Sequence, residues 1–281
     1  MDNKRRYRLR LGCKRDRPDG RDIPMSAVLP VFRLPKRYDL TPRMTPVKDQ
    51  GDEGTCVAFA GIVGVKEEEE KSEYRRYIEL SPRWAYYKCK ALDGIPDEEG
   101  TYPRVMMKVL AKFGVPLEYY WPYSPHQTDK PKTGAAKEAY RYRIKAYARL
   151  NSLFEMRQSL IVNGSFIAGV EVFNGFMGPN AGRTGKVPMP RPSERSIGGH
   201  AVCIVGYDDG SEYFKFKNSW GKTWGDKGYG YLPYRYMEEH SMDVWSATDL
   251  IEEPEKIVSA RERVLKGIAS PALGYVRAGS Q

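Results

Sequence analysis

The order of apolar and polar positions predicts helices in the first half of the chain and strands in the second. Residues 50–54 are polar or glycine and predict a loop, whereas residues 56–65 are mostly apolar and precede a charged run over 66–71. This pattern predicts a helix whose first turns are buried and whose end reaches water, with Thr55 as its N-cap. The four glutamates at 67–70 are expected on a solvated face of that helix.

Two further helical stretches follow in the first half. Ser81-Pro82 predicts the start of a helix that ends near residue 92, because serine caps free N–H groups and proline fits the first helical position. Apolar residues at helical spacing over 105–113, followed by Gly114, predict the next helix. Residues 45–140 therefore predict a mainly helical domain.

The second half alternates strand-like runs with turns. One helix is expected between the Asn151-Ser152 cap and Asn163-Gly164. Residues 175–198 are rich in glycine and proline and predict a long loop, which compact domains tend to keep for a function. Runs of apolar and aromatic residues predict strands over 166–173, 200–207 and 213–217.

The last two of these strands are expected to form a hairpin around Asp208-Asp209-Gly210. If the turn centres on Asp209, His200 faces Asn218 across the hairpin, with Cβ atoms about 4.5–5.5 Å apart. An asparagine carbonyl at that distance can accept an imidazole N–H and fix the tautomer of the ring. A slip of one residue would place the two side chains on opposite faces.

Cys56 and His200 are the candidate nucleophile and base. A cysteine in the first turn of a helix lies among free N–H groups at the positive end of the dipole, which favours a thiolate. The chain has three histidines. His126 lies in a loop rich in proline and polar residues and His240 in a polar segment, whereas His200 opens an apolar strand and has Asn218 as a partner.

Several motifs occur together in one order: Gln50 six residues before Cys56, then His200-Ala201-Val202, then Asn218-Ser219-Trp220-Gly221. His200 follows Cys56 by 144 residues, within the roughly 130–150 expected for thiol peptidases of this pattern. With these motifs the chain resembles the papain-like cysteine peptidases, most closely their microbial branch with a short N-terminal prosegment. The resemblance covers about residues 34–249.

This resemblance implies an α+β fold of two domains, a helical left domain and a β-barrel-like right domain, with the active site in the cleft between them. It also implies a peptidase that forms an acyl-enzyme and uses no metal or other cofactor. The residues assigned to catalysis are Cys56, His200, Asn218 and Gln50, the last as an oxyanion donor. The residues assigned to the substrate are Gly199, Pro103 and Trp220, and Trp220 is also expected to shield the His–Asn hydrogen bond.

The chain then divides into four parts. Residues 34–140 are expected to form the helical domain that carries the nucleophile, and 141–249 the β-rich domain that carries the histidine and asparagine. Residues 1–33 form a basic leader with ten Lys and Arg against four Asp, a net charge of +6. Residues 250–281 are a C-terminal extension, expected to pack loosely.

Three interpretations of the leader stay open. An inhibitory prosegment is favoured, because residues 17–22 look like the short leader of the microbial branch and residues 34–40 resemble the mature start. The second interpretation is a solvated, partly disordered basic tail. The third is a nucleic-acid contact, disfavoured because few aromatic residues are interleaved with the basic ones. Cys13 within the leader has no assigned role.

Glu53 and Glu98 stand where secreted members of this family have the two halves of a disulfide. The fold is therefore expected not to depend on a disulfide, as in a reducing compartment. The basic N-terminus leads into no apolar signal segment, and no run of 18 apolar residues is present. A cytoplasmic location away from membranes is the resulting expectation.

The two glutamates also suggest how the leader is bound. Together with Asp52, Asp97 and Glu99 they are expected to form an acidic rim beside the site. Such a rim would hold the basic leader more weakly as salt rises, and would favour Lys or Arg on the acyl side of the cut. The alternative is a leader held by apolar residues, namely Ile23, Val28 and Phe32.

Two other functions stay open. A papain-fold pseudopeptidase would bind peptides or partners without cutting them, although the complete Gln/Cys/His/Asn set argues against it. A transpeptidase would pass the same acyl group to an amine. Each catalytic candidate also has an ordinary structural role, as a buried thiol, a strand histidine or a turn residue. The expected partners are peptide or protein substrates and the chain's own leader, with no nucleic acid and no membrane.

Overall fold

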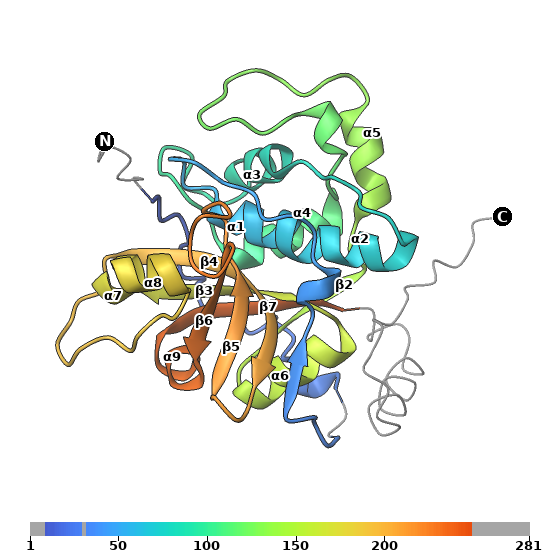
Figure 1. The fold of residues 1–281 in the computed structure, drawn as a ribbon. Helices are drawn as coiled ribbons and strands as arrows, with labels where there is room; N and C mark the ends of the chain where they lie inside the picture. Colours follow the sequence, from blue (N-terminus) through green and yellow to red (C-terminus); the bar gives the residue numbers. More distant parts are fainter. Residues whose placement is uncertain (1–8, 30–31, 249–281) are drawn as a thin grey trace.

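The computed structural model describes residues 9–29 and 32–248 of the chain. Figure 1 shows helices α1 to α5 gathered on one side of a sheet, with α6 and α9 on its other side. The α+β class expected from the sequence is confirmed. Within the described ranges, no helix combines the length and apolarity needed to span a bilayer.

Helices α1 to α5 form the first layer, in which α3 begins and α4 ends at the expected signal. Ser81 Oγ accepts the Trp84 N–H at 3.1 Å, and Gly114, with φ of 67°, follows the apolar helix. These helices are α1 (Cys56–Phe59), α2 (Glu67–Tyr74), α3 (Pro82–Lys90), α4 (Pro103–Lys112) and α5 (Ala135–Ala139). Three-residue 3-10 turns are η1 (Met25–Ala27), η2 (Thr41–Arg43), η4 (Glu118–Tyr120) and η5 (Tyr140–Tyr142), and η3 (Ala60–Lys66) is a π-helical segment.

One continuous helical segment carries Cys56 at its start. It runs through α1, the wide π-helical turn η3 and α2. It packs directly on strand β4 (Gly198–Asp208), because a Cβ added at Gly64 would lie 2.4 Å from the Cβ of Cys203. Glycine at this position therefore lets the nucleophile helix approach the sheet closely.

The prediction of a solvated face at 67–70 is wrong. Glu67 accepts hydrogen bonds from Thr45 Oγ1 at 2.7 Å and from the Leu80 N–H at 3.1 Å, and lies 3.5 Å from Lys48 Nζ. Segments distant in sequence cover this face, which the helical pattern alone does not reveal. The buried glutamates of the run are Glu67, Glu68 and Glu70.

Lys217, at the end of β5 (Tyr213–Lys217), belongs to the same buried cluster. Its Nζ donates to Thr45 Oγ1 at 2.9 Å and to the Val63 carbonyl at 2.8 Å. Burial lowers the pKa of Lys217 to about 8, although Glu67 opposes the shift. The unfolded chain holds this proton to a higher pH, so charging Lys217 costs the fold about 3 kcal/mol below pH 8, and the cost fades as pH rises toward 10.5.

Lys217→Met is therefore expected to raise the free energy of unfolding at pH 7, and its advantage over the parent should shrink between about pH 8 and pH 10. Urea unfolding of both proteins across this range measures the difference. Lys215→Met, on the same strand and only half-buried, is the control and should show no such trend. A difference that stays constant with pH would contradict the depressed pKa.

The strands form an antiparallel sheet in the order β2-β7-β3-β4-β5-β6, with β1 beside β4. The three strands predicted from apolar runs, β3, β4 and β5, are confirmed. The others are short or lie beside turns, and sequence reasoning missed them. The remaining bounds are β1 (Arg37–Asp39), β2 (Ala146–Arg149), β3 (Phe166–Val172), β6 (Tyr229–Pro233) and β7 (Ser241–Thr248).

The hairpin of β4 and β5 forms, but its predicted register is wrong. Cys203 pairs with Lys217 and Tyr207 with Phe214, and an irregularity lies between Ile204 and Gly206. The strands are thus shifted by two to three residues from a turn centred on Asp209. The extra residues lie in the wider turn and the irregularity, which the Asp-Gly signal does not predict.

Further helices accompany the sheet. The helix expected between 151 and 163 is α6 (Leu153–Val162), and Ser152 Oγ accepts the Glu155 N–H at 3.2 Å as its cap. The stretch 175–198 is only partly a loop, because α7 (Asn174–Met177) and α8 (Pro179–Thr184) fold within it. The last described helix is α9 (Tyr234–His240).

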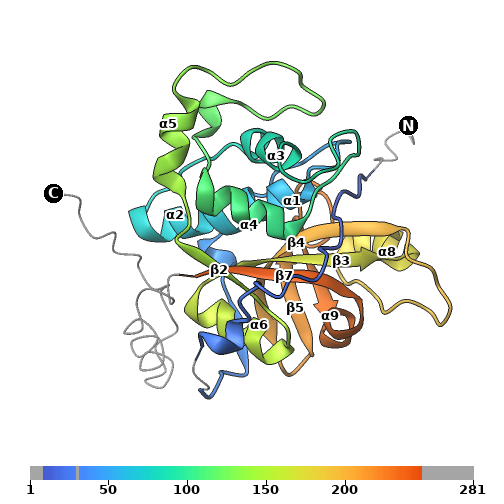
Figure 2. The ribbon, with the colours of Figure 1, turned by 180° about the vertical axis from the view of Figure 1, so that it is seen from behind.

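The described part of the leader is ordered along the body of the protein, so the solvated-tail alternative is wrong for residues 9–29. Figure 2 shows the leader passing beside α4, between the helices and the sheet. Further on, the Arg149 N–H donates to the Ile23 carbonyl at 2.8 Å, and Met25 and Leu29 are buried. The expected extension at 250–281 lies outside the described residues.

All four cysteines are free and buried.

Candidate active site

Cys56 is the first residue of α1 and is fully buried. The backbone N–H of Ala201, the residue after His200 on strand β4, lies near enough to the thiol to lower its pKa. Thr55 precedes the helix, but its hydroxyl pairs with the Tyr123 hydroxyl at 2.8 Å. The helix begins where predicted, and the expected side-chain cap is wrong.

His200 and Asn218 are brought together despite the shifted register. His200 Nε2 lies 2.8 Å from Asn218 Oδ1, which also accepts the Ser219 N–H at 2.8 Å. Because Oδ1 is the acceptor in both contacts, the network assigns the imidazole proton to Nε2. His200 Nδ1 is buried without a hydrogen-bond partner among the described residues. This nitrogen is the one left to exchange a proton with a thiol.

Aromatic rings cover the His200–Asn218 hydrogen bond. Trp220 stacks on His200, with ring centroids 4.3 Å apart and an interplanar angle of 22°. Phe176 of α7 meets the imidazole edge-on at 6.0 Å, and Trp224 packs against Trp220 at 5.4 Å. These contacts agree with the shielding expected of Trp220. They place its ring against the imidazole rather than in an exposed substrate position, since Trp220 is only 3% exposed.

The side-chain amide of Gln50 is held in one orientation. Ser219 Oγ donates to its Oε1 at 2.6 Å. Its Nε2 therefore points the other way, where it donates to the Glu53 carbonyl at 2.9 Å and to the Arg10 carbonyl at 3.3 Å. An amide nitrogen fixed in this way beside the start of α1 is suited to bind a carbonyl oxygen.

The loop that carries Gln50 is tied down by a buried ion pair. Arg83 of α3 makes a two-pronged contact with Glu53, with Nη1 to Oε1 at 3.0 Å and Nη2 to Oε2. The Tyr123 hydroxyl donates to Glu53 Oε2 at 3.3 Å and to the Gln50 carbonyl at 2.7 Å. Glu53 is therefore an internal anchor, and the expectation that it forms part of an acidic rim is wrong.

Leader residues cross the site itself. The Gly12 N–H lies near enough to the Cys56 thiol to lower its pKa, and the Arg10 carbonyl accepts from Gln50 Nε2. On either side, the Cys13 N–H donates to the Gly199 carbonyl at 3.0 Å and the Thr101 N–H donates to the Gly12 carbonyl at 2.9 Å. The leader is thus hydrogen bonded to the sheet and to the start of α4 at once.

Two of the three residues expected to contact substrate, Gly199 and Pro103, meet Cys13 of the leader. The Gly199 carbonyl accepts the Cys13 N–H. The Cys13 sulfur and Pro103 both lie next to Gly169, because a Cβ added at Gly169 would be 2.7 Å from Cys13 Sγ and 3.4 Å from Pro103 Cγ. Cys13, which had no assigned role in the sequence, therefore occupies the position expected for a substrate side chain.

The acidic rim is present in part. Lys14 Nζ lies 2.7 Å from Glu98 Oε2, and Arg10 Nη1 lies 3.9 Å from Glu99 Oε2. The apolar alternative also holds in part, because Phe32 is buried while Ile23 is largely exposed. Both kinds of contact therefore hold the leader.

Burial acts on the reactive pair in opposite directions. It raises the pKa of the Cys56 thiol, although N–H donors from Ala201 and Gly12 oppose the shift. It lowers the pKa of His200, although Asn218 opposes that shift. With the leader in place both groups are held in their neutral forms, and the thiolate expected from the helix dipole alone is not favoured.

Within residues 9–29 and 32–248, no group of three or more His, Cys, Asp or Glu is placed to hold a metal ion.

The sequence profile described as the papain family cysteine protease matches residues 34–244. The chain belongs to this family. It is 32% identical over 228 residues to an uncharacterised peptidase C1-like protein of Acanthamoeba polyphaga mimivirus, a match that covers 76% of this chain and 73% of the viral one. Chymopapain of Carica papaya is 31% identical over 202 residues, covering 66% of this chain and 51% of chymopapain.

Solved structures of papain-family proteases share the fold. Xylellain, a cysteine protease from Xylella fastidiosa, superposes with a TM-score of 0.75 at 30% identity, covering 88% of this chain and 99% of xylellain. Procathepsin B of Trypanosoma congolense has a TM-score of 0.65 at 20% identity, covering 86% of each chain, and shows the fold alone. As a member of the papain family, the chain is a cysteine-type peptidase.

Sequence reasoning missed several residues of this papain-family site. Ser219 was visible within the Asn-Ser-Trp-Gly motif, and its hydroxyl orients Gln50. Phe176 lies in a stretch read as a loop, and Arg83 is one of many basic residues with no spacing signal toward Glu53. Only the folded chain brings these side chains to the site.

Proposed function

We propose that the chain hydrolyses peptide bonds through Cys56, His200 and Asn218, and that its own leader inhibits it. The observation that carries the first part is the covered His200–Asn218 hydrogen bond, together with the N–H of Ala201, the residue after His200, acting on the Cys56 thiol. The observation that carries the second part is the leader backbone at Gln50 and Cys56.

In the proposed reaction, the Cys56 proton passes to His200 Nδ1 and the sulfur attacks the peptide carbonyl carbon. His200 then protonates the leaving amine, the C–N bond breaks, and the acyl group remains bound to the sulfur. A water molecule, deprotonated by His200, releases the acid and restores the thiol. Asn218 keeps Nε2 occupied, so that Nδ1 handles the proton in each step. The backbone N–H of Cys56 and the Gln50 amide are the donors to the developing oxyanion.

Gln50→Ala is expected to lower kcat by about 10²–10³-fold, because one oxyanion donor is lost. Alkylation of Cys56 by iodoacetamide passes through no oxyanion and should change little, provided that both rates are measured in chains whose leader is already displaced by Gly12→Ala, because Gln50 also holds the Arg10 carbonyl. Gln127→Ala, in the loop near His126, is the matched control. Equal loss of turnover and alkylation in Gln50→Ala would show that Gln50 supports the thiol rather than the oxyanion.

The leader covers the site without presenting a cleavable bond to the sulfur. It offers the Gly12 N–H to the thiol, and an amide N–H is no electrophile. The Arg10 carbonyl meanwhile takes the Gln50 donor that a substrate carbonyl would need. Burial of the site also favours the neutral thiol and imidazole. Occupation and electrostatics thus both oppose turnover.

The fit at Gly12 provides a sharp test of this inhibition. A Cβ added at Gly12 would lie 2.1 Å from the Gly54 carbonyl oxygen. This is a steric clash, and a backbone atom cannot move aside as the end of a flexible side chain could. Gly12→Ala should therefore displace the leader and raise both peptide hydrolysis and Cys56 alkylation by about tenfold or more. Gly20→Ala is the matched control, because an added Cβ there meets nothing within 4 Å. Equal rates for the two variants would contradict inhibition by the leader.

A further inference from the structure

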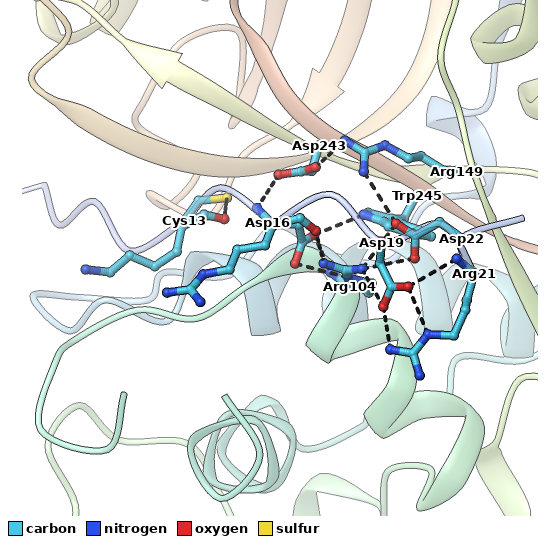
Figure 3. A network of polar contacts seen from close by, with 11 residues as sticks. Cys13, Asp16, Asp19, Arg21, Asp22, Arg104, Arg149, Asp243 and Trp245 are labelled. Atoms are coloured by element: carbon cyan, nitrogen blue, oxygen red, sulfur yellow. Dashed lines mark hydrogen bonds and ion pairs between the residues drawn. The ribbon is translucent and has the colours of Figure 1, made fainter. Parts of the chain in front are cut away.

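The leader makes a second set of contacts beyond the active site, drawn in Figure 3, and they centre on Asp16. Asp16 is buried, with 6% of its surface exposed. Its Oδ2 accepts the Arg104 N–H at 3.0 Å and the Trp245 indole N–H at 3.2 Å. Its Oδ1 lies 3.6 Å from Arg104 Nε. Every group that faces this carboxylate in these contacts is a donor.

The Arg104 N–H lies in the first turn of α4, where backbone donors have no partner within the helix. The N-cap residue Tyr102 makes no side-chain capping hydrogen bond, and Pro103 at the first helical position has no N–H to give. Asp16 therefore supplies from the leader the carboxylate cap that α4 lacks.

The guanidinium of Arg104 is also neutralised from the leader. Arg104 is 8% exposed, and its Nη1 lies 3.4 Å from Asp19 Oδ2 and 3.1 Å from Asp22 Oδ1. Its Nη2 donates to the Arg17 carbonyl. Within the described part of the chain, all the hydrogen-bond and ion-pair partners of this side chain are leader residues.

The sheet completes the contact from the opposite side. The Asp16 N–H donates to Asp243 Oδ2 at 2.6 Å, and Arg149 Nη2 holds Asp243 Oδ1 at 2.6 Å. Arg149 also reaches Asp22 Oδ2 at 3.5 Å. Asp16 is therefore bonded to α4 through its side chain and to β7 through Asp243 and Trp245, so it joins the helical layer to the sheet.

We propose that Arg104, the start of α4 and the Trp245 indole form a carboxylate-binding site, and that Asp16 docked there locks the leader over the active site. The inference rests on the proposed inhibition by the leader and adds the site that holds it. The ligand class is an aspartyl carboxylate on an extended chain, because three donors converge on its two oxygens. The basic residues of the leader meet the exposed Glu98 and Glu99, whereas its acidic residues make the buried contact.

Alkylation of the full-length chain with iodoacetamide at pH 7.5, followed residue by residue by mass spectrometry, tests this lock. Opening of the leader uncovers Cys13 and Cys56, whereas Cys89 and Cys203 lie in the core and react only on general unfolding. The four thiols thus separate release of the leader from loss of the fold.

Asp16→Asn and Arg104→Gln are each expected to speed the reaction of Cys13 and Cys56 by about ten- to a hundredfold, because a charged hydrogen-bond partner is lost from a buried site. In Asp16→Asn, the side-chain NH₂ also replaces one of the two oxygens that face the N–H donors of Arg104 and Trp245, so two donors would face each other. The double variant should be no faster than the faster single one, because both changes break one contact. Arg21→Gln is the control, because this exposed leader side chain pairs with Asp19 and should leave the rates unchanged.

The Gly12→Ala chain serves as the open reference. If it reacts fast while Asp16→Asn and Arg104→Gln react at the parental rate, the lock is overturned and inhibition by the leader stands. If Gly12→Ala itself reacts at the parental rate, inhibition by the leader fails and the lock fails with it. If Cys89 and Cys203 react as fast as Cys13 in both lock variants, the cluster supports the fold and the lock is likewise overturned.

Discussion

Replacing Cys56 or His200 with alanine is expected to lower kcat/KM for peptide hydrolysis by about 10⁴–10⁶-fold, with the double variant scarcely worse than either single one. The thiol and the imidazole act as one unit, because the imidazole takes the proton from the sulfur that attacks. Removing either group therefore abolishes the function of the other. Asn218→Ala should be milder, because Asn218 orients the ring and does not react. All variants are measured in the Gly12→Ala chain, so that the position of the leader does not differ between them.

The control for this series is His126→Ala, whose imidazole contacts only the exposed carboxylate of Asp52 among the described groups. It should retain full activity. A folded Asn218→Ala protein as inactive as Cys56→Ala would contradict a purely orienting role. A double variant far worse than both single ones would show that the two residues contribute independently, against the proposed mechanism.

Arg83→Met is expected to lower the free energy of unfolding by about 3–5 kcal/mol, because it leaves the Glu53 carboxylate buried without its counter-ion. Glu53 is 7% exposed, and the Tyr123 hydroxyl and the His126 N–H would be its remaining donors. Urea unfolding at pH 7 measures the loss. Turnover should fall as well, because the Glu53 carbonyl helps to hold the Gln50 amide.

The double variant Glu53→Leu/Arg83→Met should recover much of that stability, since replacing both partners of a buried pair with apolar groups is often neutral. The exposed pair of Arg235 with Glu239 supplies the control, and Arg235→Met should not change the stability measurably. Stability of Arg83→Met equal to that of the parent would show that the pair is not the anchor of the Gln50 loop. A double variant as unstable as Arg83→Met would point to lost packing instead.

The helix starts and the strands with strong apolar runs were predictable because their signals are local. Ser81 caps α3 and Ser152 caps α6 through hydrogen bonds to residues three positions ahead, and β3 and β4 are long runs of core residues. Elements such as β2 and β6 were missed because they carry mixed residues. Strand β2 pairs with β7, which is distant in sequence, and β6 pairs with β5. The strand conformation of β2 and β6 therefore comes from these partners and not from their own sequence pattern.

The sequence predicted which residues belong to the candidate site, but not the contacts and burial that surround them. The order of Gln50, Cys56, His200 and Asn218 predicted which groups react, and the fold brings His200 and Asn218 to 2.8 Å although the register assumed for them was wrong. Their contact tolerates that error because Asn218 lies just beyond β5, where the chain leaves the ladder and can turn toward the histidine.

What the sequence by itself determined is therefore the candidate reacting groups and the elements that follow from short-range signals. Tertiary structure alone decided which charged groups are buried and which partners they have. It buried Glu67 under segments from Thr45 and Leu80, paired Glu53 with Arg83 in place of an exposed rim, and set Asp16 against Arg104. The physical reason is that burial and ion pairing depend on which distant segments cover a residue. Local periodicity carries no information about that cover.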